Sequence, residues 1–124
     1  MGFKKTLPLF FPFNAGTFQN PVGVSITGSN TYTGPITNVT NLDNIGAQVI
    51  WTGNPQGTLT VNGSNDGVNF FALTFNPALA QPAGSALSYG INLNQFPWPY
   101  LEFQYVNTSG SGTLLLSITG KDLN

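Results

Sequence analysis

Cysteine and histidine are both absent from this chain of 124 residues. Without cysteine there is no disulfide framework and no thiolate metal site, although a domain of this length buries enough apolar surface to fold without such cross-links. Without either residue type there is no Ser-His-Asp triad, no cysteine nucleophile and no standard zinc site. The sequence therefore excludes the most common catalytic and metal-binding arrangements.

Charged residues are almost as scarce. They make up 6% of the chain, against about a quarter in typical soluble domains, and the formal net charge is −1. The chain has no arginine, and its basic residues are Lys4, Lys5 and Lys121. Such a chain lacks the basic surface that nucleic acid or an anionic membrane would need, and no segment has the length of a transmembrane helix. We therefore expect neither nucleic acid nor a membrane as a partner.

The acidic residues do not form a catalytic pair in the sequence. Asp43, Asp66 and Asp122 fall in turns or at the C-terminus, and Glu102 is expected on the outward face of a strand. A paired-carboxylate mechanism needs two acids within several ångströms of each other. Since no glycine-rich nucleotide motif is present either, we expect no enzyme, no catalytic residue, no metal and no cofactor.

What the chain does contain is apolar residues that alternate with polar ones. Val49 and Trp51 alternate with Gln48 and Thr52, and the same period of two recurs between turn signals rich in glycine, asparagine and proline. Such alternation predicts strands with one buried face. The sequence predicts an all-β antiparallel β-sandwich, jelly-roll-like, from residue 21 to residue 124. We expect about eight strands, at residues 21–27, 35–40, 45–52, 57–63, 69–75, 87–94, 100–107 and 112–120.

Residues 1–20 differ from the rest and are expected to form an extended N-terminal arm. Pro8 and Pro12 prevent this segment from forming a regular central strand. Two interpretations remain open: the segment packs across its own sandwich, or it docks on a neighbouring subunit. For the second, the partner-binding residues would be Leu7, Leu9, Phe10, Phe11 and Phe13.

Two further features each allow a functional and a structural interpretation. The loop Asn65–Asn69 offers oxygen ligands for Ca²⁺, but it has one carboxylate and also the residues that a hairpin turn requires. Trp98 and Tyr100 could stack on a sugar ring, or could instead close one end of the sandwich or form a subunit contact. For both features we favour the structural interpretation.

The segment Gly57–Phe70 resembles a pattern in small phage virion proteins, in which a strand is followed by G-S-x-D-G-x-x-[WF]. Trp98–Tyr105 and Ser109–Lys121 look like the aromatic-rich strand and the closing hairpin of the same proteins. The resemblance covers about residues 45–121. The same hairpin occurs in galactose-binding-like sandwiches, whose relatives often have an arginine where this chain has Glu102 or Gln104.

The resemblance implies a capsid decoration (cement) protein of a bacteriophage virion. Such a protein would lie on the capsid surface and contact the major capsid protein and copies of itself, as a symmetric homo-oligomer. A first alternative is a carbohydrate- or receptor-binding module of a phage tail that uses Trp98 and Tyr100. A second is a small jelly-roll coat protein, although three lysines would give a genome-facing surface little counter-charge.

Overall fold

The structure is a computed structural model that describes residues 6–17, 19–40, 42, 44–74, 87–93 and 96–121. This part of the chain contains strands and turns, and no helix in it is long and apolar enough to cross a bilayer. The strands are β1 (Thr6–Phe13), β2 (Val24–Ile26), β3 (Asn30–Thr33), β4 (Thr37–Asn38), β5 (Asn44–Gly53), β6 (Gln56–Ser64), β7 (Phe71–Ala72), β8 (Leu87–Asn92), β9 (Tyr100–Ser109) and β10 (Gly112–Lys121).

The first strands of the chain pair with the last ones, and successive pairs lie inside one another, so that the whole chain forms one long hairpin. β1 and β2 pair with β10, β3 and β4 with β9, β5 with β8, and β6 with β7, so each pair lies inside the one before it. The hairpin is folded over on itself, because β10 also pairs with β5 and β9 also pairs with β6. This antiparallel arrangement is the topology of a jelly roll.

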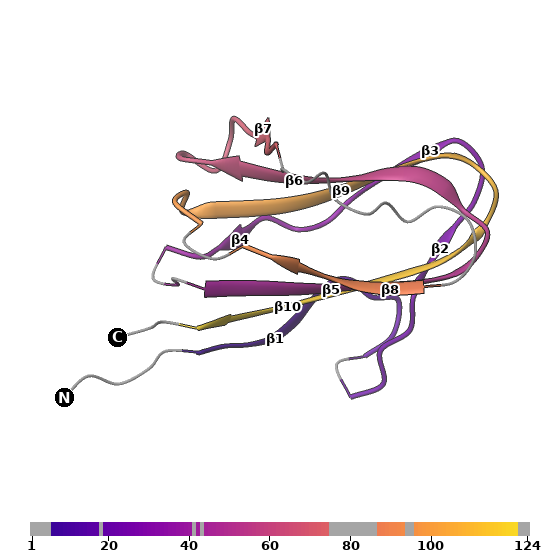
Figure 1. Cartoon of the computed structure of the whole chain (residues 1–124), viewed down its shortest axis with the longest axis horizontal. Coiled ribbons are helices and arrows are strands. Elements are labelled where there is room, and N and C mark those ends of the chain that lie inside the picture. The colour runs from indigo at the N-terminus through magenta and orange to yellow at the C-terminus, as the bar shows by residue number, and fades with distance from the viewer. Residues whose placement is uncertain are drawn as a thin grey trace.

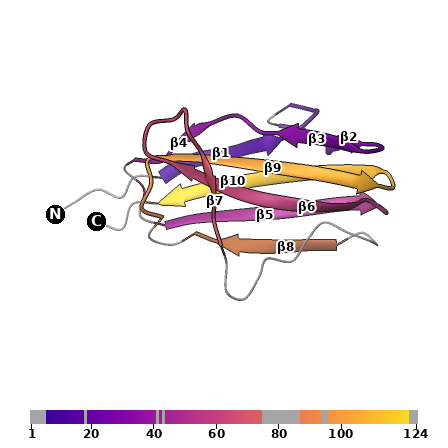
Figure 2. The same ribbon diagram turned by 90° about the horizontal axis from the view of Figure 1, so that it is seen from above.

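Two facing sheets result (Figure 1). Sheet A has the order β1-β10-β5-β8, with β2 also beside β10, and sheet B has the order β3-β9-β6-β7, with β4 also beside β9. Figure 2 shows the long strands β5, β6, β9 and β10 running along the length of the sandwich. The structure thus confirms the predicted all-β sandwich.

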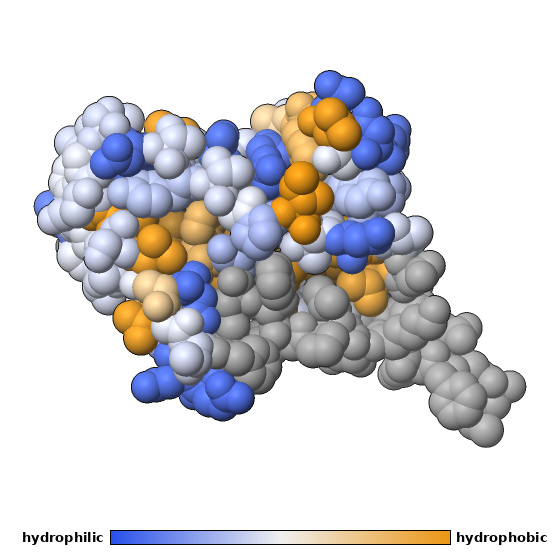
Figure 3. All heavy atoms as spheres, turned by 180° about the vertical axis from the view of Figure 1, so that it is seen from behind, coloured by the Kyte–Doolittle hydropathy of each residue, from blue (hydrophilic) through white to orange (hydrophobic). Residues whose placement is uncertain are grey.

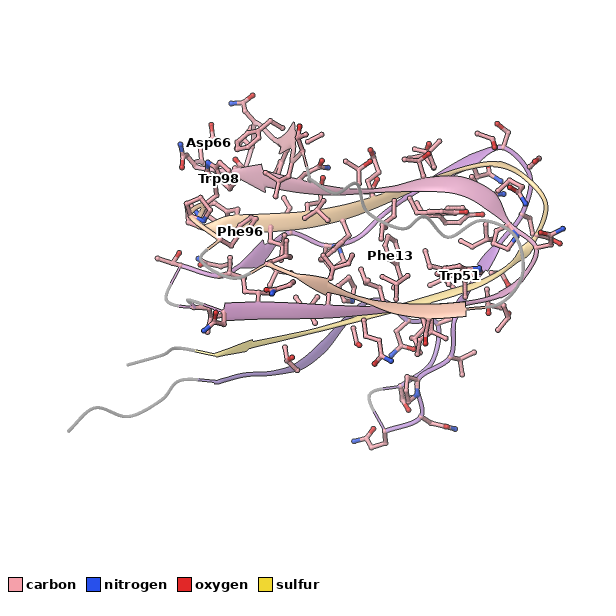
Figure 4. The ribbon with its side chains drawn as sticks, in the orientation of Figure 1. Phe13, Trp51, Asp66, Phe96 and Trp98 are labelled. Carbon is pink, nitrogen blue, oxygen red and sulfur yellow. The ribbon has the colours of Figure 1, made fainter. Side chains whose placement is uncertain are left out.

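The core lies between the sheets and follows the period of two. In β5 the residues Ile45, Ala47, Val49 and Trp51 are buried, while Gln48 between them is exposed. Trp51 and Phe13 both point into the space between the two sheets (Figure 4). Each large apolar side chain that is fully buried in this way stabilises the fold by about 1.5–3 kcal/mol. The other core residues are Ile26, Val39, Leu59, Val61, Ile91, Leu93, Phe96, Leu101, Phe103, Tyr105, Leu114, Leu116 and Ile118.

A buried asparagine joins two turns at one end of the sandwich. The side-chain amide of Asn107 donates hydrogen bonds to the carbonyl oxygens of Gly28, 2.6 Å away, and of Gly110, 3.1 Å away. Its carbonyl oxygen accepts a hydrogen bond from the hydroxyl of Tyr105 at 3.1 Å. Asn107 is fully buried, so its amide replaces water as the partner of these turn carbonyls.

The strand boundaries differ from the predicted ones in the short elements. β3 occupies Asn30–Thr33, where no strand was expected, and β7 covers only two residues of the predicted 69–75 strand. β4 likewise covers two residues of the predicted 35–40 strand. The long strands β5, β6, β9 and β10 lie where the sequence places them.

The N-terminal segment differs from the expected arm at residues 6–13. These residues form β1, which pairs with β10 from Thr6↔Lys121 to Phe13↔Leu116. Register shifts interrupt this pairing, as two prolines at a sheet edge require. Phe13 is 4% exposed and belongs to the core, which favours the interpretation that this segment packs across its own sandwich. Partner binding by Leu7, Leu9, Phe10 and Phe11 stays a prediction, since their side chains lie outside the described residues.

Candidate interaction site at the β6–β7 end

The turn after β6 is built around two side chains that satisfy its backbone. Ser64 is fully buried, and its hydroxyl oxygen accepts hydrogen bonds from the N–H groups of Asp66 at 3.2 Å and Gly67 at 3.0 Å. Gly67 has a φ of 75°, a conformation that glycine adopts without strain. The G-S-x-D-G pattern in the sequence therefore supplies the side chain and the glycine that this turn requires.

The carboxylate of Asp66 is held by four donors. Its Oδ1 accepts hydrogen bonds from the N–H groups of Val68 (2.9 Å) and Asn69 (2.8 Å) and from the hydroxyl of Ser64 (2.9 Å). Its Oδ2 accepts one from the side-chain amide of Asn69 at 2.9 Å. These bonds, led by the backbone N–H of Asn69, hold the pKa of Asp66 well below its ordinary value of 3.8.

These bonds also weigh against the calcium interpretation of the loop. The carboxylate oxygens of Asp66 already serve the backbone of its own turn, and Ca²⁺ requires six to eight oxygen ligands. Among the described residues, no group of three or more acidic residues lies together that could hold a metal ion. The geometry supports the structural interpretation of residues 65–69 as a hairpin turn.

Three aromatic rings pack beside this turn. Trp98 makes edge-to-face contacts with Phe71, with ring centroids 4.8 Å apart, and with Phe96, 5.5 Å apart. Trp98 also lies on the backbone of Gly63, where an added Cβ would come within 3.2 Å of the indole. Figure 4 shows Trp98, Phe96 and Asp66 at the same end of the sandwich. Rings in this arrangement stabilise one another beyond their area of burial.

The predicted interface aromatics are therefore largely engaged within the chain. Trp98 is half-buried between Phe71, Phe96 and Gly63, so it does not stand free as a stacking platform for a sugar. Tyr100 is also half-buried, and its ring lies 3.4 Å from the position that a Cβ on Gly67 would occupy. Both side chains pack against the β6–β7 hairpin.

The residues that this hairpin leaves exposed were not singled out from the sequence. Val68 is 79% exposed and Phe71 is 42% exposed, and we call this pair the apolar tip. Orange atoms gather at this end of the molecule in Figure 3, at the upper right. The alternation of apolar and polar residues stops within the turn, so it could not show which way Val68 and Phe71 point. The one sign of this surface in the sequence is that Val68, an apolar residue, stands inside a turn motif.

Electrostatic features near the tip are few. Glu102 on β9 accepts a hydrogen bond at 3.2 Å from the side-chain amide of Asn62, its cross-strand neighbour on β6. Beside the aromatic cluster, the carboxylates of Asp66 and Glu102 both have hydrogen-bond partners within the chain. The site therefore offers an apolar contact surface with neutral polar groups around it, which is a suitable composition for binding another protein.

The strand order of the two sheets defines a jelly-roll sandwich, and a fold of this kind is found in a viral protein. In the crystal structure of the infectious bursal disease virus VP2 subviral particle, a chain matches with 9% sequence identity and a TM-score of 0.54. A chain in the structure of the Gx strain of the same virus matches with 12% identity and a TM-score of 0.56. The match covers 96% of this chain in both cases, and 33% and 32% of the viral chains.

Dimeric latent PorU from Porphyromonas gingivalis is a further match, with 13% identity and a TM-score of 0.47 over 96% of this chain and 13% of that one. No protein-family model matches the sequence, and no curated protein resembles it. This chain thus spans about a third of the viral chains, and at such identities the likeness establishes the fold.

Proposed function

We propose that this chain is a structural protein of a bacteriophage virion, and specifically a head decoration (cement) protein. In this role it lies on the capsid surface and contacts the major capsid protein and copies of itself. It acts through these contacts and has no catalytic step. The observation that carries the proposal is the jelly-roll topology combined with an apolar tip on a nearly uncharged surface.

The fold supports a virion role. The matched viral chains come from a subviral particle and from a virus, so a jelly roll with this arrangement of strands occurs within a virion protein. The resemblance of residues 45–121 to small phage virion proteins points in the same direction.

The surface supports contact as the mode of action. With a net charge of −1, copies of the chain repel one another little when they are crowded on a lattice. The apolar tip is rimmed by polar groups such as Asn69, as in many protein–protein interfaces. Because residues 6–13 form part of sheet A, we assign the principal capsid contact to the apolar tip and not to an N-terminal arm.

Rebinding to particles that lack this chain tests the proposal. Phe71→Ser and Val68→Ser each remove an exposed apolar side chain, and Val106→Ser, on the outer face of sheet B, is the matched control. Because Val68 is 79% exposed and Phe71 is 42% exposed, burial of the remaining surface of either is worth about 1 kcal/mol, so each tip variant should bind about fivefold more weakly.

Co-sedimentation of purified chain with particles measures this binding, and thermal unfolding checks that each variant folds. The Val106→Ser control should bind like the wild type. Undiminished binding by both tip variants would contradict the proposed contact, and no binding by the wild type would contradict the decoration role itself.

A further inference from the structure

The outer face of sheet A contains a hollow that the proposed capsid contact does not use. Its volume is about 610 Å³, which lies within the range typical of small-molecule sites. It lies on the side of sheet A away from the core, whereas the apolar tip lies at the edge of sheet B. Among the described residues its lining comes from β5, β8 and β10: Asn44, Ile45, Gly46, Ala47, Gln48, Gly90, Ile91, Asn92, Ser117, Ile118 and Thr119.

Two glycines keep this hollow open. Gly46 on β5 and Gly90 on β8 are diagonal neighbours, since Gly46 pairs with Asn92 and Gln48 pairs with Gly90. A Cβ on Gly46 would meet no atom within 4 Å, and one on Gly90 would meet only the carbonyl oxygen of Ala47, at 3.8 Å. Neither glycine has a positive φ. The chain's own described atoms therefore give no steric reason for either glycine.

Glycine inside a strand weakens the strand, and it commonly marks a bulge, a bend or the close approach of a ligand or another backbone. A bulge does not explain these two positions, because the register of β5 with β8 and with β10 runs without a shift through Gly46 and Gln48. The open space above the two glycines favours close approach by a bound molecule as the explanation.

The chemistry of the hollow limits what that molecule is. A molecule in the hollow lies over the face of the sheet, where β5 is paired on both sides with β10 and β8, so strand addition to a sheet edge does not describe its binding. Recognition must use the outward side chains, which are the amides of Gln48 and Asn44 and the hydroxyls of Ser117 and Thr119. All of them are neutral, and each both donates and accepts hydrogen bonds.

We propose that this hollow binds a neutral, hydroxyl-rich ligand, namely a saccharide unit, with its ring over Gly46 and Gly90. The two glycines leave the backbone uncovered, so a sugar ring can lie close against it, and the surrounding amides and hydroxyls bind the hydroxyl groups of the sugar. The site is distinct from Trp98 and Tyr100. It does not depend on the decoration role, because it lies on sheet A and its occupancy is measured on the isolated chain.

NMR of the ¹⁵N-labelled chain tests this site with four probes: glucose, galactose, mannose and N-acetylglucosamine. At least one sugar should shift the amide signals of Gly46, Gln48, Gly90 and Thr119 saturably, and glycerol at the same concentration should not. Gly46→Val should fill the hollow without strain and weaken binding by about tenfold or more. Thr60→Val on the outer face of sheet B is the control and should bind like the wild type.

Three outcomes would overturn the proposal. The first is that none of the four sugars shifts these signals. The second is that Gly46→Val, shown to be folded by its amide spectrum, binds the sugar as well as the wild type does. The third is that the same signals move with protein concentration in the absence of sugar, which would assign the hollow to a second copy of the chain.

Discussion

At the scale of single residues, polar side chains close the turns of this molecule, and apart from Asp66 in the turn after β6 the ones named here are neutral. Asn107 binds the carbonyls of two turns, Ser64 binds two N–H groups of a third, and Asn14 accepts hydrogen bonds from the N–H groups of Gly16 and Val22, both at 2.9 Å. Each of these side chains replaces water on a backbone group, and this is how a chain with so few charges orders its loops.

Replacement of Asn107 by alanine should destabilise the fold strongly. It leaves the carbonyls of Gly28 and Gly110 and the hydroxyl of Tyr105 without this partner, at a cost of about 2–3 kcal/mol in the free energy of unfolding. Chemical denaturation measures the loss. The matched control is Asn38→Ala, since Asn38 is exposed and its side-chain oxygen accepts hydrogen bonds from its near neighbour Thr40, and it should cost less than about 0.5 kcal/mol. Equal losses in the two variants would contradict the role of Asn107.

Asp66 should make stability depend on acidic pH. Its pKa is lower in the folded chain than its ordinary value of 3.8, so it stabilises the fold above that value and this contribution is lost as the pH falls below it. The melting temperature of the wild type should therefore fall below about pH 4, and that of Asp66→Asn should fall less over the same range. Thermal unfolding between neutral and acidic pH gives both curves, and parallel curves would show that Asp66 is not the group responsible.

At the scale of elements, the sequence predicts those strands that are long and buried on one face. β5, β6, β9 and β10 each have nine or ten residues, so their period of two is visible over several repeats. β4 and β7 have two residues each, too few to show a period. β1 carries two prolines and breaks the alternation through its register shifts, so pairing along the edge of β10 could not be predicted from pattern alone.

The candidate site was predicted in part, for a related reason. Trp98 and Tyr100 were found because aromatic residues stand out in composition. Which of their faces is covered depends largely on Gly63 and Phe71, which are distant from them in sequence. The hollow over Gly46 and Gly90 depends on how β5 and β8 align, and the sequence of either strand alone does not contain that alignment.

Phe13→Ala tests whether β1 is an integral part of the sandwich. Phe13 is 4% exposed and packs in the core, so its truncation should lower the free energy of unfolding by about 3 kcal/mol or more. If residues 6–13 were instead a detachable arm, the substitution would not change the free energy of unfolding. Phe71→Ala, at a position 42% exposed, is the control and should cost about 1 kcal/mol. Denaturant titration of the two variants distinguishes the cases, and a loss for Phe13→Ala no larger than the control would restore the arm interpretation.

At the scale of the whole molecule, the nested pairing brings the N-terminal strand β1 beside the C-terminal strand β10 at one edge of sheet A. The apolar tip, with Val68 in the turn before β7 and Phe71 in β7, lies at the edge of sheet B. The outer face of sheet A, with its neutral hollow, is separate from that edge. One copy thus has distinct surfaces for the proposed capsid contact and for the proposed saccharide, so the two can act independently.

The copy number of this chain in purified virions tests the central claim most directly. Quantitative mass spectrometry of purified particles gives the ratio of this chain to the major capsid protein. A decoration protein that covers the capsid lattice should be present in a fixed, simple ratio to the major capsid protein and at a comparable copy number. The chain's absence from the particles, or its presence in only a few copies per particle as for a tail component, would contradict the account.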